Sequence, residues 1–146
     1  MDILNNQRNS SSSLISVASR LLSARLQHAF AANNIDITIE QWTLLFYLWE
    51  KDGLTPRELA ISANKEKSTI TRQIDALEKR NLITREPHYG DKRNKIIKLT
   101  KKGKSIKTGA LGAANDVTMV SEENISEEEL LIFKKVLKSI ISNVKK

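Results

Sequence analysis

Two short helices joined by a tight turn, predicted over residues 55–80, constrain the fold of this chain most strongly. Residues 55–58 read TPRE, which combines an N-cap threonine, a proline at the first helical position and a capping glutamate. The first helix then runs to about Ala63. The second runs from about Lys65 to Arg80, with Asn81 as a left-handed cap. In such a pair, a short helix can brace a longer one against DNA.

The longer helix has two chemically different faces. Ile70, Ile74 and Leu77 follow at spacings of four and three, which predicts one buried stripe. The positions farthest from this stripe are Lys65, Ser68, Arg72 and Lys79, flanked by Thr69 and Ala76. Small hydroxyls and long cations on an outer face suit the DNA major groove better than plain solvent.

A basic hairpin follows this helix. Residues 82–89 and 95–100 are predicted as short strands joined by residues 90–94, and Pro87 limits the first to an edge strand. Between Lys79 and Lys107 there are eleven lysines and arginines against two acids, a net charge of +9, so the rest of the chain carries −2 of the total +7. This asymmetry favours a phosphate-binding surface over a mixed, solvated one.

Further helices flank this region on both sides. One is predicted over residues 10–33, starting in a serine run, and a second is capped by Thr38 and Gln41. After the hairpin a fifth helix begins at about residue 101, and Ser126 caps the last one. The last helix carries an apolar stripe of Leu130, Phe133, Leu137, Ile140 and Val144. We expect a second copy of the chain to cover this stripe, which predicts a homodimer.

The order of these elements is that of a winged helix-turn-helix protein. We predict a mostly α-helical single domain over residues 1–146, with the winged helix-turn-helix at 34–100. The helix-turn-helix itself lies at about 55–80, the wing at 83–100, and dimerisation helices at 10–33 and 101–146. The longer helix would read base edges in the major groove while the hairpin reaches an adjacent minor groove.

Residues 58–104 resemble the MarR family of transcriptional regulators. The similarity rests on an ordered set of motifs: STITR at residues 68–72, LEK before LI at residues 77–83, an Asp-x-Arg wing at residues 91–93, and LTKKG at residues 99–103. Asn81 stands where the family usually has glycine, but asparagine tolerates the same left-handed geometry. The resemblance implies a repressor that binds a pseudo-palindromic operator.

The resemblance also implies which residues meet DNA. Ser68, Thr69, Thr71 and Arg72 would contact bases and phosphates, Arg93 would enter the minor groove, and Asp91 would orient the wing through a nearby arginine. Three lysines complete the predicted DNA-binding set: Lys95, Lys101 and Lys104. Thr71 lies nearer the helix flank and could make only a phosphate or buried contact. Asp91 could equally be a turn residue beside glycine, and Arg93 could be merely solvated.

Four of the seven aromatic residues fall in the helix that Thr38 caps. In similar proteins this helix lines a pocket, so a small aromatic acid could sit among Trp42, Phe46 and Trp49, with its carboxylate near Arg20 or Arg25. An aromatic stripe at helical spacing is more often plain core, and both interpretations stay open.

Composition excludes several other classes of protein. The chain has no cysteine, which excludes disulfides, thiolate metal sites and thiol-oxidation sensors. His28 and His88 lack the spacing of metal ligands. We find no catalytic arrangement and expect no enzyme, no cofactor and no metal. The absence of a long apolar run predicts a cytoplasmic protein with no membrane partner.

A DNA-binding regulator is therefore the function that the sequence favours. One alternative is a DNA-architectural or single-strand-binding module without operator specificity, but the hairpin carries only Tyr89 as a stacking residue. Another is an enzyme or a helical interaction protein that only borrows the fold.

Overall fold

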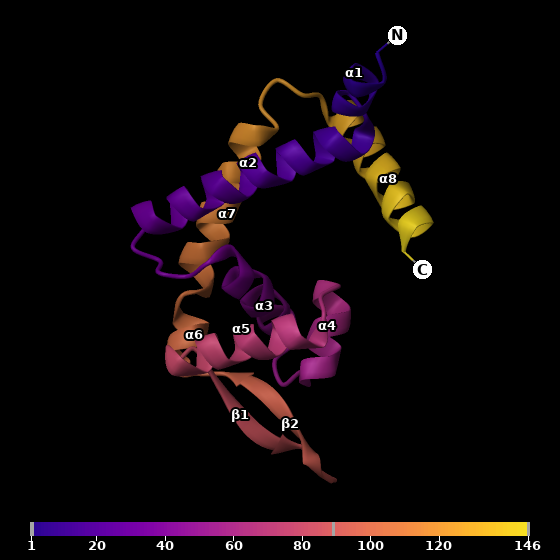
Figure 1. The fold of residues 1–146 in the computed structure, drawn as a ribbon. Coiled ribbons are helices and arrows are strands. Elements are labelled where there is room, and N and C mark those ends of the chain that lie inside the picture. Colours follow the sequence, from indigo (N-terminus) through magenta and orange to yellow (C-terminus); the bar gives the residue numbers. More distant parts are fainter. Residues whose placement is uncertain (1, 89, 146) are drawn as a thin grey trace.

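Helices make up most of the computed structural model, which describes residues 2–88 and 90–145 apart from the side chains of residues 91–93 (Figure 1). The helices are α1 (Ile3–Arg8), α2 (Ser11–Ala32), α3 (Ile39–Glu50), α4 (Pro56–Ala63), α5 (Lys67–Lys79), α6 (Lys101–Ser105), α7 (Lys107–Ser121) and α8 (Glu127–Val144). Strands β1 (Ile83–His88) and β2 (Asp91–Leu99) pair between α5 and α6. The predicted fold class, a mostly α-helical winged helix-turn-helix, is confirmed.

Side-chain caps set the start of four helices where the sequence predicts them. The hydroxyls of Ser10, Thr38, Thr55 and Ser126 each accept a hydrogen bond from the backbone three residues on. Such a cap contributes about 1 kcal/mol, because it satisfies a backbone N–H that has no partner within the helix. At all of these except Ser10, the reciprocal glutamine or glutamate bond completes a capping box.

Two predicted helix boundaries are wrong in detail, and one short helix was not predicted. Helix α5 begins at Lys67 rather than Lys65, because Asn64 is left-handed at φ 52° and residues 64–66 form the turn after α4. The fifth predicted helix is interrupted at Ile106, which separates α6 from α7. Helix α1, a short polar helix capped by Asp2, was not predicted.

The hydrophobic core lies between α3, α4, α5 and the base of the wing. Its fully buried side chains include Leu45, Leu59, Ile70 and Ile97. Above this core, α2 crosses α7 (Figure 1), where Ala110, Ala113 and Val117 are buried. Helix α8 contains no buried residue. The helix-turn-helix is thus packed independently of α8.

The wing is an antiparallel pair with a shorter turn than expected. Ile83 pairs with Leu99, and the register continues to Pro87 and Lys95 before an irregularity places His88 opposite Asp91. Residues 91–94, predicted as loop, therefore belong to β2. Gly90 makes the tight turn with φ 86°, a conformation that glycine adopts without steric cost. On its other edge, β2 bridges to Leu54 before α4.

Candidate nucleic-acid interface

Helix α5 presents its predicted outer face to solvent because its opposite face is fully buried. Ile70, Ile74 and Leu77 are each no more than 1% exposed. Ser68, Thr71 and Arg72 are exposed, and Thr69 is half-buried. The helix is consequently fixed in rotation, with hydroxyls and a guanidinium directed away from the core.

Local hydrogen bonds organise this outer face. The Arg72 guanidinium donates to Thr69 Oγ1 at 3.4 Å. The Thr71 hydroxyl donates to the Lys67 carbonyl at 3.0 Å, and its exposure removes the buried alternative for this residue. Within the described part of the chain Arg72 has no carboxylate partner, so its charge is available to an external anion.

The C-terminal end of α5 is tied to the start of α3. Arg80 pairs with Asp36 at 2.9 Å and donates to the Gln41 side-chain oxygen at 3.1 Å. That same oxygen accepts the Thr38 N–H in the α3 capping box. Gln41 is buried with 6% exposure, so Arg80 completes a polar junction between two helices instead of facing DNA.

Arg85 on β1 joins the wing to α5. It forms ion pairs with Asp75 and Glu78, one helical turn apart on α5. The pKa of the Arg85 guanidinium is raised, and the largest cause is its hydrogen bond to Asp75. Burial lowers this pKa, but the negative charges of Glu78 and Asp75 raise it further. Arg80 and Arg85 both count toward the phosphate-binding charge predicted from the sequence. Each is paired with a carboxylate within the protein, so these two charges are less available to DNA than the charge count suggests.

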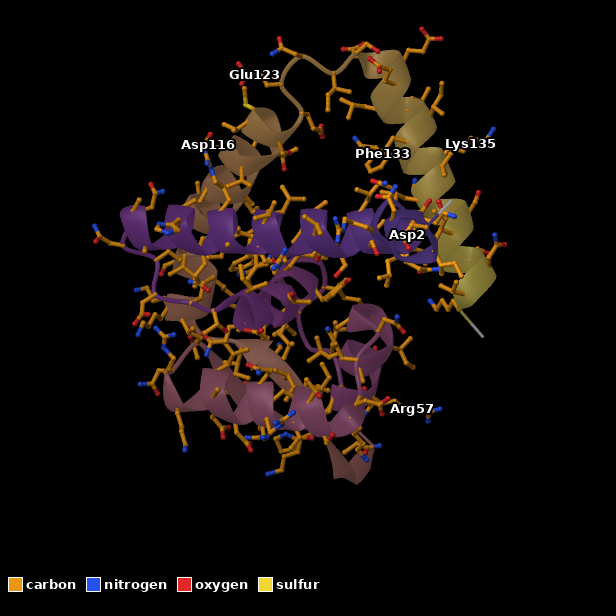
Figure 2. The ribbon with its side chains drawn as sticks, turned by 45° about the horizontal axis from the view of Figure 1, so that its top comes forward. Asp2, Arg57, Asp116, Glu123, Phe133 and Lys135 are labelled. Atoms are coloured by element: carbon orange, nitrogen blue, oxygen red, sulfur yellow. The ribbon has the colours of Figure 1, made fainter. Side chains whose placement is uncertain are left out.

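The wing itself carries Lys95, which is exposed on β2. The side chains of Asp91 and Arg93 lie outside the described residues, so their predicted roles in wing orientation and minor-groove contact stay predictions. Arg57, predicted only as part of a capping signal, points outward from the first turn of α4 (Figure 2).

Helix α6 follows the wing and lies beside the end of α5. The Lys102 ammonium donates to the Arg80 carbonyl at 3.3 Å, and the Thr100 hydroxyl donates to the Asn81 carbonyl at 2.6 Å. Lys101 and Lys104 are exposed. These two lysines therefore extend the positive surface beyond the C-terminal end of α5.

The aromatic residues of α3 form a continuous chain of ring contacts. The Trp42 ring centroid lies 5.4 Å from Phe30, 5.7 Å from Phe46 and 5.8 Å from Trp49. Trp42 and Trp49 pack against the hydrophobic core. These contacts account for the rings as core, the more ordinary of the two interpretations.

The two arginines of the predicted effector pocket are exposed on α2. Arg25 lies about 7 Å and Arg20 about 15 Å along the helix axis from Phe30, which marks the level of the aromatic chain, at 1.5 Å per residue. The structure thus brings the three aromatic residues together, and along α2 Arg25 lies nearer than Arg20 to Phe30, which contacts Trp42.

Neither a metal centre nor a membrane span is found among the described residues. Residues 2–88 and 90–145 contain no group of three acidic or histidine side chains that could hold a metal ion. None of their helices has both the length and the apolar character needed to cross a membrane.

Fold and site together define a winged helix-turn-helix DNA-binding protein. The profile of the MarR family matches residues 37–95. The chain is 32% identical to the HTH-type transcriptional repressor YetL of Bacillus subtilis over 113 residues, 77% of this chain and 67% of that protein.

Solved structures show the same fold. A mutant of MarR from Escherichia coli, complexed with operator DNA, has a TM-score of 0.87 at 23% identity, covering 97% of this chain and 99% of that one. CouR from Rhodococcus jostii, bound to p-coumaroyl-CoA, has a TM-score of 0.77 at 21% identity, covering 90% and 91%. The chain belongs to the MarR family and is a DNA-binding transcriptional regulator.

Proposed function

We propose that this regulator is a repressor that binds a pseudo-palindromic operator as a homodimer. The observation that carries the proposal is the outer face of α5, where Ser68 and Arg72 are exposed opposite a fully buried stripe and Thr71 is exposed on the flank. Serine and threonine hydroxyls can meet several base edges, and an arginine recognises guanine through two hydrogen bonds. The repressor name of YetL supports the sign of regulation.

Large exposed apolar surfaces support the dimer. They are Ile3 and Leu4 of α1, Leu14, Val17, Leu21 and Leu22 of α2, and Ile132, Phe133, Val136, Ile141 and Val144 of α8. In both views α1 and the N-terminal half of α2 lie beside α8 (Figures 1 and 2). Soluble monomers rarely expose an apolar patch of this extent. A second copy of the chain, with the same three helices, would cover it symmetrically.

The predicted stripe on α8 occupies one side of this surface. Phe133 is 55% exposed, whereas Leu130, Leu137 and Ile140 are half-buried. Phe133 and Lys135 project from opposite sides of α8 (Figure 2). We therefore place Phe133 in the dimer interface and Lys135 outside it.

Dimer symmetry sets the geometry of the operator. Two α5 helices related by a two-fold axis reach successive major grooves when they lie about 34 Å apart, which separates the half-site centres by roughly 10 base pairs. Lys95, Lys101 and Lys104 would contact the phosphates that flank each half-site, and Arg93 would reach the minor groove next to it.

A small aromatic acid is the proposed effector. It would insert beside the chain of Trp42, Phe46 and Trp49 and shift the population toward a dimer with a different spacing between the α5 helices. CouR, of the same fold, was solved bound to p-coumaroyl-CoA. Arg25 is nearer than Arg20 to pair with the carboxylate.

The proposal is tested by selecting bound fragments from the source genome with purified protein, then footprinting the best site. We expect one short protected region with two related half-sites, and a dimer by light scattering. Uniform, weak protection of every fragment would indicate an architectural protein instead. Loss of the footprint with salicylate-like compounds, together with quenched tryptophan fluorescence, would support effector release. Quenching without loss of the footprint would exclude it.

A further inference from the structure

Helix α6 is fixed at its middle residue, Gly103, from three directions. The Trp49 indole Nε1 of α3 donates to the Gly103 carbonyl at 3.0 Å, and the Gly103 N–H donates to Thr100 Oγ1 at 3.0 Å. On the third side, a Cβ at Gly103 would lie only 2.1 Å from the Leu82 carbonyl oxygen. Gly103 is buried, and α6 cannot move away from α3 without losing the hydrogen bond from Trp49.

The contacts at Gly103 also determine where two lysines point. Helix α6 has five residues, too few to be stable without outside support. At 3.6 residues per turn, Lys101 and Lys104 lie about 60° apart on the helix, on the side away from Gly103. Both are exposed, and neither has a carboxylate partner within the part of the chain that the structure describes.

We propose that Trp49 is a positioning residue for DNA binding: its hydrogen bond to Gly103 holds α6 so that Lys101 and Lys104 meet the DNA phosphates. The inference rests on the phosphate role given to these lysines in the proposed function. Trp49 itself is half-buried, and its ring packs edge-on against Trp42. A turn fixed in advance leaves less conformational entropy to lose when its lysines bind.

The test replaces Trp49 with phenylalanine, which keeps an aromatic ring and removes only the N–H donor. Tyr47→Phe is the matched control, because it removes a polar group from another aromatic ring of α3, and the Tyr47 hydroxyl makes no hydrogen bond within the described residues. We expect Trp49→Phe to weaken operator binding about tenfold, through the cost of ordering two side chains. The slope of the logarithm of the binding constant against the logarithm of salt concentration, the salt slope, should fall in magnitude. The decrease should be up to about 0.9 for each phosphate that the protein no longer neutralises. Tyr47→Phe should leave the salt slope unchanged.

A double-mutant cycle separates positioning from general stability. Lys101→Ala with Lys104→Ala is measured in the native and the Trp49→Phe backgrounds, with thermal unfolding recorded for each protein. Positioning predicts that the lysine changes lose most of their effect when Trp49 is already replaced. Independent, multiplying effects would overturn the inference and leave the proposed function standing. If the lysine changes have no effect even in the native background, the inference fails together with the phosphate role of these two lysines, whereas operator binding through α5 is tested separately by the footprint.

Thr100→Val tests by a second substitution whether α6 must be held in place for Lys101 and Lys104 to act. It removes the hydroxyl that accepts the Gly103 N–H and leaves α3 untouched. We expect it to reduce the effect of the lysine changes in the same way. If Trp49→Phe does not fold, the result for Thr100→Val decides whether α6 needs to be held in place.

Discussion

Replacement of Arg85 by glutamine should weaken DNA binding more than the loss of one wing charge can explain. The Arg85 guanidinium contacts carboxylates at two positions of α5, Asp75 and Glu78, so it sets the angle between the wing and the helix. Recognition helix and wing must enter different grooves at the same time. If the wing is no longer held against α5, its contacts with DNA should therefore become weaker.

The magnitude follows from the exposure of the three side chains. Arg85 is 26% exposed, Asp75 55% and Glu78 43%. A hydrogen bond between charged groups contributes about 1.5–3 kcal/mol when shielded, but pairs this open to solvent contribute about 1 kcal/mol or less each. We expect Arg85→Gln to lower the free energy of unfolding by about 1–2 kcal/mol.

The same variant should bind the operator about tenfold more weakly. Because the pKa of Arg85 is raised, its guanidinium stays charged on the alkaline side until strong alkali. The stability difference between native protein and variant should thus stay constant between about pH 6 and 9. Urea unfolding at several pH values and fluorescence anisotropy with labelled operator measure the two effects.

Two controls separate geometry from charge. Lys98→Gln removes one wing charge that has no carboxylate partner within the described residues, and we expect a smaller loss of affinity. The triple variant Arg85→Gln, Asp75→Asn, Glu78→Gln has a net charge one unit more positive than the native chain, because it loses one cation and two acids. It still lacks the ion pairs that join the wing to α5. If the triple variant binds as tightly as the native protein, repulsion by the two acids explains the effect and the positioning argument is refuted.

Other residues give further expected outcomes. Arg72→Ala should cost about 1–3 kcal/mol of binding and relax base preference at one position of each half-site, as measured on an operator library; equal weakening at every base would make Arg72 a phosphate contact. Arg93→Ala should lose most affinity on operators with A·T-rich flanks, whose narrow minor groove attracts a guanidinium, and equal loss on G·C-rich flanks would exclude that role. Phe133→Ala should raise the dimer dissociation constant at least about tenfold in sedimentation experiments. Lys135→Ala on the opposite side of α8 should not, and equal effects would place the interface elsewhere.

The sequence by itself determined the features that depend on neighbouring residues. The caps at Thr38, Thr55 and Ser126 are confirmed because a hydroxyl and the backbone three residues on meet in any helix that starts there. The stripe of Ile70 and its partners is confirmed for a similar reason. Helical periodicity alone brings these side chains to one face, so the opposite face of α5 could be predicted residue by residue.

The tertiary structure alone decided which polar groups find partners inside the protein. Arg80 reaches Gln41 across 39 positions, and Trp49 reaches Gly103 across 54. Arg80 and Arg85 belong to the cluster of positive charge seen in the sequence, but a charge count cannot show that each has a carboxylate partner. Separation along the chain does not determine distance in space. Only the packing of α3 against α5, the wing and α6 brings these donors and acceptors together, and it leaves the Arg72 guanidinium facing outward.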